Sequence, residues 1–288
     1  MNKIILSALI ITFTTGTIFA QSKKAVKVKV TPNEQVVLDF EKKAWYDKNE
    51  VAVDKLISKY YIQHNPQSGD GPASIKGMFP YVSPKINTIR MFSEGDLVFQ
   101  HNLSKGWGDT NTYVSMDVFR VKNGQIVEHW DAMQVNAEKT VSGHTMTDGE
   151  TTIKNLKETS ANKKVVQGFL DDCIYGGNFQ NISKHISTKK YIQHNPNVGD
   201  GLQGFNDAMK QMQEHGMTMK YEKTYRVIAE GNFVFVHSKG EFAGKQVAFM
   251  DLMRVENGKI VEHWDVIQDA IPAEKTKSGH DMFEQLTK

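Results

Sequence analysis

Cysteine is nearly absent from this chain of 288 residues, which contains only Cys173. An intrachain disulfide is therefore excluded, even in a compartment that would permit one. Cys173 lies in the stretch VVQGFLDDCIY, which has a helical pattern, and no activating partner is evident for its thiol. We expect a small core residue rather than a catalytic thiol.

A strong charge of either sign is also lacking. The formal net charge is +2, and lysines and glutamates are interspersed along the chain rather than clustered. This balance argues against nucleic acid as a partner. Phosphate-binding loops and dinucleotide fingerprints are missing too, because the glycines of GDGPASIKG have the wrong spacing. We therefore expect no organic cofactor.

Ten histidines are present, but the local spacings typical of a metal site are not. The sequence has no HxH, HxxxH or HExxH motif, and a thiolate ligand set is impossible with one cysteine. A GxSxG serine nucleophile is missing as well. We expect no metal. The alternative is a cluster formed in space by His64, His101, His129 and Asp131.

Long hydrophobic runs are limited to the N-terminus. Residues 1–20 combine a short basic start with IILSALIITFTTGTIFA, a pattern typical of a secretory signal peptide cleaved after Ala20. Threonines and Gly16 interrupt the run, whereas a membrane helix needs about 20 consecutive apolar residues. We expect export to the periplasm or the medium, a basic tail at 21–30, and no membrane contact after cleavage.

What the sequence does contain is an internal duplication. YIQHNP stands at 61–66 and again at 191–196. MDVFRVKNGQIVEHWDAMQ at 116–134 is matched by MDLMRVENGKIVEHWDVIQ at 250–268. Offsets such as 130 (from 61 to 191) and 134 (from 116 to 250) are far longer than a solenoid repeat. The duplication therefore concerns whole domains.

The duplication predicts a domain at 31–148, a linker at 149–160 and a second domain at 161–288. In each copy helical patterns come first, and period-two strand patterns follow. The strands are joined by hairpin signals such as Asn123-Gly124 and Asn257-Gly258. Helices followed by an antiparallel meander predict an α+β fold, with the helices packed on one face of a curved sheet.

Eight histidines fall into pairs that match between the copies, His64/His194, His101/His237, His129/His263 and His144/His280. The densest polar cluster is EHWD, and in a strand His129, Asp131 and Met133 share one face. Apolar neighbours make a carboxyl harder to ionise, as a general base near neutral pH requires. The alternative is an ordinary polar surface face, with Trp130 pointing inward.

The register of the hairpin decides whether a second aspartate joins this face. A two-residue turn places Asp117 on the face of Trp130, whereas a bulge or a three-residue loop places it on the face of Asp131. The same choice applies to Asp251 in the second copy. The sequence leaves both registers open.

YIQHNP followed by GDG, together with a closing NGxIVEHWDxxQ, resembles the SnoaL-like polyketide cyclase family of the nuclear transport factor 2-like superfamily. The resemblance covers nearly all of each copy. It implies two tandem cone-shaped domains, each an antiparallel-rich sheet wrapped around N-terminal helices and enclosing an apolar cavity. It also implies ring closure by aldol chemistry, with an aspartate as acid and base and without metal or organic cofactor.

Carried onto this chain, the resemblance implies that Asp131 and Asp265 are the acid/base residues. His64 and Asn65 would line the first cavity, and His101 would lie on a neighbouring strand. The candidate catalytic residues are then Asp131, His64, His101, His129, Asp265, His194, His237 and His263. The candidate ligand-binding residues are Asn65, Asn195, Met133 and Ile267.

Whether the chain is an enzyme stays open at this point. A cofactor-free lyase, isomerase or aldol cyclase would act on a small apolar carbonyl compound, with an aspartate as base and His64, His101 or Asn65 as donors to the enolate oxygen. The alternative is an exported, non-catalytic binding protein for a small hydrophobic ligand. In both cases the partner is a small molecule. We also expect the two copies to pair as an intrachain pseudo-dimer, with further self-association as an option.

Overall fold

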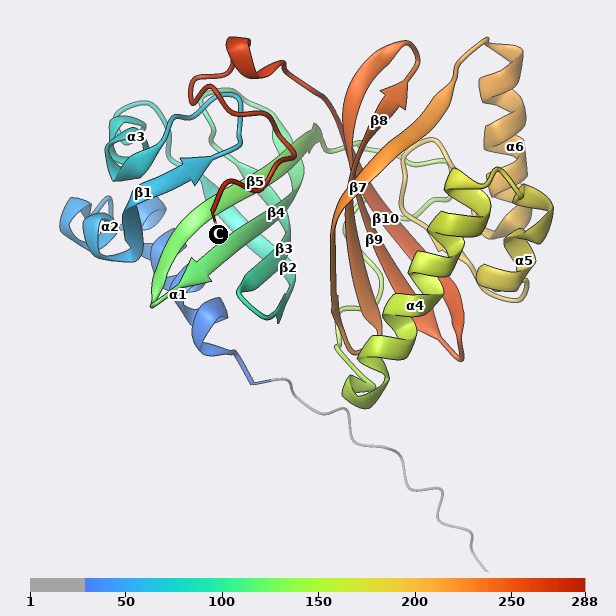
Figure 1. Ribbon diagram of the computed structural model, residues 1–288. Coiled ribbons are helices and arrows are strands. Elements are labelled where there is room, and N and C mark those ends of the chain that lie inside the picture. The colour runs from blue at the N-terminus through green and yellow to red at the C-terminus, as the bar shows by residue number, and fades with distance from the viewer. Residues whose placement is uncertain (1–28, 288) are drawn as a thin grey trace, which may run out of the picture.

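The computed structural model describes residues 29–287, which form two five-stranded sheets, one from each half of the chain (Figure 1). The predicted signal peptide at 1–20 and most of the predicted tail at 21–30 lie outside the described residues. Among the described residues, no helix has both the length and the apolar character needed to cross a membrane.

Helices open the first unit, as the sequence predicted. A capping box starts the first helix, because the Thr31 hydroxyl accepts from the Glu34 N–H and the Glu34 carboxylate accepts from the Thr31 N–H. The helix continues into a π-helical turn that carries Trp45. The helices are α1 (Pro32–Glu41), the π turn (Lys42–Tyr46), α2 (Glu50–Leu56) and α3 (Gly71–Gly77).

The first sheet has the strand order β1-β5-β4-β3-β2. Its strands are β1 (Ile57–Gln63), β2 (Lys85–Glu94), β3 (Leu97–Lys105), β4 (Thr112–Lys122) and β5 (Gln125–Val135). The strands β2 to β5 form the expected antiparallel meander, and β1 adds a parallel edge to β5. In this pairing Gln63 lies beside His129. The two repeated motifs of the sequence therefore meet in space.

The second unit repeats this arrangement, with strand order β6-β10-β9-β8-β7. Its helices are α4 (Thr159–Phe169), a π turn (Leu170–Tyr175), α5 (Ile182–His185) and α6 (Gly201–Glu214). Its strands are β6 (Ile192–Gln193), β7 (Met219–Glu230), β8 (Phe233–Phe242), β9 (Lys245–Glu256) and β10 (Lys259–Asp269). The predicted α+β fold of two tandem units is confirmed.

A bulge next to each Asn-Gly turn determines the face of the second aspartate. The pairing of β4 with β5 shifts by one residue between Arg120 and Val121. Beyond this shift Asp117 pairs with Asp131, so both side chains lie on one face. The hairpin of β9 and β10 carries the corresponding shift. Of the two registers that the sequence left open, the bulged one is correct.

The two sheets pack against each other through the faces opposite their helices (Figure 1). The rings of Phe99 and Phe235 stack with centroids 4.4 Å apart, and Trp130 and Trp264 are fully buried in the same apolar cluster. Each half thus covers the sheet face that the other half would otherwise expose to water. Both faces of each sheet are consequently buried.

The segment after each sheet crosses to the other unit. After β5, the Val141 N–H donates to the Pro196 carbonyl at 3.0 Å, and after β10, the Lys277 N–H donates to the Pro66 carbonyl at 3.1 Å. Both acceptors are the proline that ends YIQHNP. The exchange of segments ties each copy of this motif to the other half of the chain.

Candidate functional site

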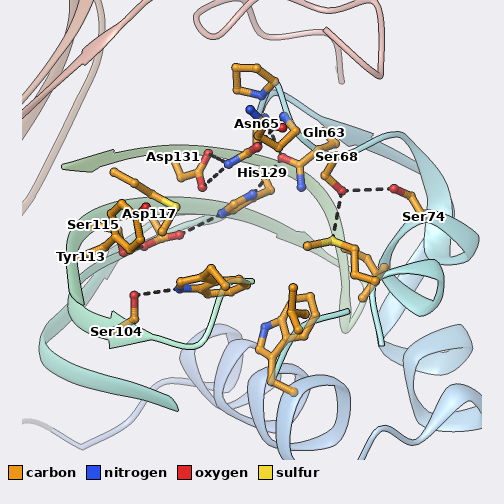
Figure 2. A pocket seen from close by; sticks show the side chains of 18 of the residues that line it. Gln63, Asn65, Ser68, Ser74, Ser104, Tyr113, Ser115, Asp117, His129 and Asp131 are labelled. Carbon is orange, nitrogen blue, oxygen red and sulfur yellow. Dashed lines mark hydrogen bonds and ion pairs between the residues drawn. The ribbon is translucent and has the colours of Figure 1, made fainter. Parts of the chain in front are cut away.

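Each sheet and its helices enclose a cavity. The first has a volume of about 830 Å³ and the second about 600 Å³. Both lie within the range of volumes that hold small organic ligands. Polar side chains line the first cavity from several elements, and Gln63, Asn65, His129 and Asp131 lie together where the two repeated motifs meet (Figure 2).

Asp131 is buried at the wall of the first cavity, with a side chain held by Asn65. The Asn65 amide nitrogen donates to both carboxylate oxygens, at 3.0 and 2.7 Å (Figure 2). Burial raises the pKa of Asp131 to about 6, with the charge of Asp117 adding to the shift and His129 and Asn65 opposing it. A carboxyl with such a pKa can take up a proton and return it near neutral pH.

His129 lies between two acceptors. Its Nδ1 is 2.9 Å from Gln63 Oε1, and its Nε2 is 3.2 Å from Asp117 Oδ1. Gln63 Oε1 also accepts from the Asn65 N–H, which identifies it as the amide oxygen, so Nδ1 of the ring carries a proton. Burial opposes the charged ring, but the hydrogen bond to Asp117 and the nearby carboxylates outweigh it and raise the pKa of His129. Both ring nitrogens thus lie against acceptors, a geometry that stabilises the imidazolium form.

Asp117 serves as the acceptor that orients this imidazole. Asn102 Nδ2 and the Ser115 hydroxyl donate to its Oδ2 at 2.9 and 2.8 Å, while His129 lies against Oδ1. Asp117 thus contacts three polar side chains, whereas Asp131 accepts from the Asn65 amide.

His64 does not line the cavity, so its predicted role as a donor there is wrong. Side chains alternate along a strand, and Gln63 and Asn65 point to the cavity while His64 points to the other sheet. Its Nε2 lies 3.0 Å from Glu128 Oε1, and its ring stacks on Trp130 with centroids 5.0 Å apart. His194 has the matching position: it stacks on Trp264 and bonds to Glu262.

His101 and His237 also face the contact between the sheets, which corrects their predicted place at the cavities. Arg90 donates to His101 Nδ1 at 3.1 Å, and Arg226 donates to His237 Nδ1 at 3.0 Å. Burial and the adjacent arginine hold the pKa of both histidines well below the usual value. Both are therefore neutral structural residues of the interface.

The second cavity carries the same polar constellation. Asn195 Nδ2 donates to Asp265 Oδ2 at 2.7 Å, and His263 lies 3.0 Å from both Gln193 Oε1 and Asp251 Oδ1. Burial, followed by the charge of Asp251, raises the pKa of Asp265 against the opposing effect of His263. Within residues 29–287 the second carboxylate oxygen, Oδ1 of Asp265, has no hydrogen-bond partner.

The predicted ligand-binding residues all line a cavity, and their role in binding a ligand stays a prediction. Asn65 and Met133 line the first cavity, and Asn195 and Ile267 line the second. Their placement follows from the strand alternation that also sets the face of the aspartates.

Glu41 is a cavity residue that the sequence analysis did not single out. It ends α1 with 8% of its side chain exposed, and burial, followed by the charge of Asp117, raises its pKa to about 8 against a hydrogen bond from Gln100. The second copy has Leu170 at the matching position, directly after a matching phenylalanine. Comparing the two opening helices would have revealed this difference.

Three side chains at each site could also hold a metal ion. Asp117, His129 and Asp131 each offer a ligand atom within 4.8 Å of the others, and the matching residues of the second cavity do the same. A metal needs a neutral imidazole nitrogen, whereas the contacts of His129 favour the protonated ring. The metal-free site therefore stays a prediction, which metal removal tests.

Comparison with known protein families finds one match, which falls within the second unit. Residues 164–274 match the SnoaL-like polyketide cyclase family. No curated protein matches the chain.

Several solved structures resemble part of the chain. An NTF2-like protein of unknown function from Cytophaga hutchinsonii is 18% identical, with 38% of this chain and 94% of that chain covered and a TM-score of 0.32. An LEH-like epoxide hydrolase of M. tuberculosis is 16% identical over 36% of this chain and 84% of its own, with a TM-score of 0.33. TsrD from Streptomyces laurentii is 18% identical over 38% and 92%, with a TM-score of 0.32.

The match over 164–274 confirms the resemblance that the repeated motifs suggested. The first unit has the same strand order and the same polar residues around its cavity. The second unit is thus SnoaL-like by its sequence, and the first is its structural repeat.

Proposed function

We propose that the first cavity is a site of cofactor-free acid/base catalysis on a small, partly apolar carbonyl compound. The observation that carries the proposal is Asp131, a carboxyl buried at the cavity wall whose pKa is raised to about 6. A general base works best when its pKa lies near the working pH. The reaction class is a lyase, isomerase or aldol-type cyclisation that begins with removal of a proton next to the carbonyl.

The surrounding residues suit such a proton transfer. Asp131 takes the proton from the α-carbon, and the electron pair moves to the carbonyl oxygen to form an enolate. The neighbouring imidazolium of His129 stabilises this negative charge. As Asp131 becomes neutral, the Asn65 amide that it held can donate to the enolate oxygen. Returning the proton to another carbon completes an isomerisation, whereas attack on a second carbonyl closes a ring.

A non-catalytic binding protein is the second candidate, and the lining of the second cavity favours it. Its side chains are largely apolar and flexible, a composition that holds hydrophobic ligands without demanding one shape. The methionines are Met209, Met212, Met217, Met219 and Met253.

Export is part of the proposal. The pattern of residues 1–20 supports a chain that acts in the periplasm or outside the cell, with cleavage after Ala20. N-terminal sequencing of the exported protein tests this directly: a mature chain that starts at Gln21 supports it, and a chain that keeps Met1 contradicts it.

Hydrogen–deuterium exchange separates the two candidates. Ketones such as 2-tetralone are incubated in heavy water with the protein, and loss of the α-proton signals is followed by NMR. Exchange that Asp131→Asn abolishes would support base catalysis in the first cavity, and Asp265→Asn serves as the matched control for the second. Binding without exchange above the buffer rate, across a panel of ketones and keto-esters, would favour the binding protein.

A further inference from the structure

The two cavities differ at matched positions, although their aspartates and histidines are the same. His101 and His237 align β3 with β8, and Asp117 and Asp251 align β4 with β9. On this alignment the first unit has hydrogen-bonding side chains in or beside its cavity where the second unit has mostly apolar ones, and Glu41, Asn102, Ser115 and Leu170 line the cavities themselves. The matched pairs are Glu41/Leu170, Gln100/Val236, Asn102/Ser238 and Ser115/Phe249.

Asn102 has an unpartnered acceptor beside the first cavity. Its Nδ2 donates to Asp117 Oδ2 at 2.9 Å and to Gln100 Oε1 at 3.3 Å, which identifies its other atom as the amide oxygen. That oxygen is buried and has no hydrogen-bond partner in the part of the chain that the structure describes. The side chain is 3% exposed and lines the cavity. A buried acceptor without a partner is unfavourable, so a ligand that donates to it gains affinity.

Glu41 complements this acceptor. Gln100 accepts from Asn102 and lies close enough to Glu41 to lower its pKa, so the Glu41 and Asn102 side chains lie around one polar subsite. With a pKa of about 8, the Glu41 carboxyl is protonated at neutral pH and offers an O–H donor as well as an acceptor. A hydroxyl group can donate to Asn102 Oδ1 and accept from Glu41 at the same time. An apolar group can do neither.

The subsite lies across the sheet from the proposed base. Gln100 pairs with Asp117, and Asp117 pairs with Asp131, so two strand spacings separate the polar subsite from the base. Two spacings are about 10 Å. When the reacting carbon of a ligand lies at Asp131, a group separated from that carbon by about two fused rings lies at the subsite.

The second cavity lacks counterparts of Glu41 and Gln100, because the second unit has Leu170 and Val236 at these positions. Leu170 lines the cavity in place of Glu41, and Phe249 is buried with its ring stacked on Tyr221 at 4.1 Å between centroids. Burying a hydroxyl against these groups without a partner is unfavourable. The nearby Tyr221 hydroxyl donates to Asp251, so an apolar far end of a ligand fits this cavity better than a hydroxyl group does.

We propose that the two cavities take different ligands: the first a carbonyl compound with a hydroxyl group at its far end, the second a compound with an apolar far end. The inference rests on the proposed function for one point, that the first cavity holds a small carbonyl compound next to Asp131. It adds the class of that compound and the side chains that select it, Glu41 and Asn102.

Methionine methyl signals report the two cavities separately. Met78 and Met133 line the first cavity, and Met212 and Met253 are among those that line the second. Full-length mature protein labelled with [¹³C-methyl]methionine is titrated with 2-tetralone and with 6-hydroxy-2-tetralone. We expect the hydroxylated ketone to bind the first cavity about tenfold more tightly than the parent ketone, and the second cavity to show the opposite order. The same order of affinity in both cavities would overturn the proposal, as would failure of the hydroxylated ketone to shift the Met78 and Met133 signals.

The variant Glu41→Leu/Asn102→Ser gives the first cavity the side chains of the second. We expect it to lose the tenfold preference for the hydroxylated ketone, while the signals of the second cavity and its affinities stay unchanged and show an intact fold. Ser238→Ala is the matched control and leaves the first cavity as it is. A preference that survives in the double variant would overturn the assignment of these two residues. Ligand binding needs no proton transfer, so the preference for the hydroxylated ketone can be measured apart from the exchange reaction. If wild type and all variants lack exchange, but Asp131→Asn keeps the preference, only the proposed catalysis is contradicted.

Discussion

Asp117 and Asp131 pair directly across β4 and β5, and the imidazole of His129 is hydrogen-bonded to Asp117 at 3.2 Å. The ring is therefore hydrogen-bonded to one carboxylate of the pair. The other is buried beside it, with a pKa raised to about 6. Two neighbouring aspartates of the same strand pair thus acquire different roles from their hydrogen bonds.

Replacing Asp131 by asparagine tests the proposed base. We expect α-proton exchange in the first cavity to fall by about 10² to 10⁴, the usual contribution of a general base. The volume of the side chain is unchanged, so the fold and ligand binding persist. The methionine methyl spectra check both, and exchange that continues at the wild-type rate would rule out Asp131.

The pH dependence follows from the raised pKa of Asp131. The ionised form accepts the proton, so the exchange rate rises with pH through about 6 and then levels off. The hydrogen bonds from Asn65 lower this pKa, so Asn65→Ala shifts the inflection to higher pH. Rate profiles between pH 4.5 and 8.5 measure both, with Asn195→Ala as the matched change in the second cavity. An inflection that does not move in Asn65→Ala would contradict the assignment of the titrating group.

Glu41 makes the stability of the protein depend on pH. Its folded-state pKa of about 8 lies above the ordinary value of 4.5, so the unfolded chain releases this proton first as the pH rises. Its contribution to stability is fully present below about pH 4.5 and is lost as the pH rises through about 8. Relative to wild type, Glu41→Gln should gain up to about 1.4 kcal/mol of unfolding free energy per pH unit in this window.

Urea denaturation of wild type and Glu41→Gln at pH 5, 6, 7 and 8 measures this difference. The exposed Glu50→Gln is the control and should show no such trend. Parallel stability curves for wild type and Glu41→Gln would show that Glu41 is ionised in the folded protein.

The contact between the sheets should dominate the stability of both units. Phe99 is fully buried there and stacks on Phe235, so Phe99→Ala should cost about 3–5 kcal/mol of unfolding free energy. Tyr60→Ala is the control, because its side chain is 74% exposed. We expect one cooperative transition in calorimetry. Two separate transitions, with Phe99→Ala affecting one of them, would show that the units fold independently.

Metal removal tests the expectation of a cofactor-free site. Protein treated with EDTA and dialysed should keep its exchange rate, because the proposed reaction uses the side chains of Asp131, His129 and Asn65. Loss of exchange that zinc or manganese restores would instead identify Asp117, His129 and Asp131 as metal ligands.

The sequence by itself determined the duplication, the order of helices and strands, and the residues of its own strand that share a face with Asp131. These follow from local patterns: alternation along a strand and the conformation of the Asn-Gly turn do not depend on distant parts of the chain. The residues of EHWD and YIQHNP also pointed to the SnoaL-like family, which the match over 164–274 confirmed.

Only the tertiary structure decided which face is the cavity. Each sheet is buried on both sides, by its own helices and by the other sheet. Both faces therefore carry apolar residues, and the sequence pattern could not show that His64 and His101 lie on the face at the sheet contact. The bulge that brings Asp117 to Asp131 depends on the pairing of two strands. Glu41 became part of the site because its helix packs over the sheet. Alternation assigns side chains to a common face, but packing decides what that face meets.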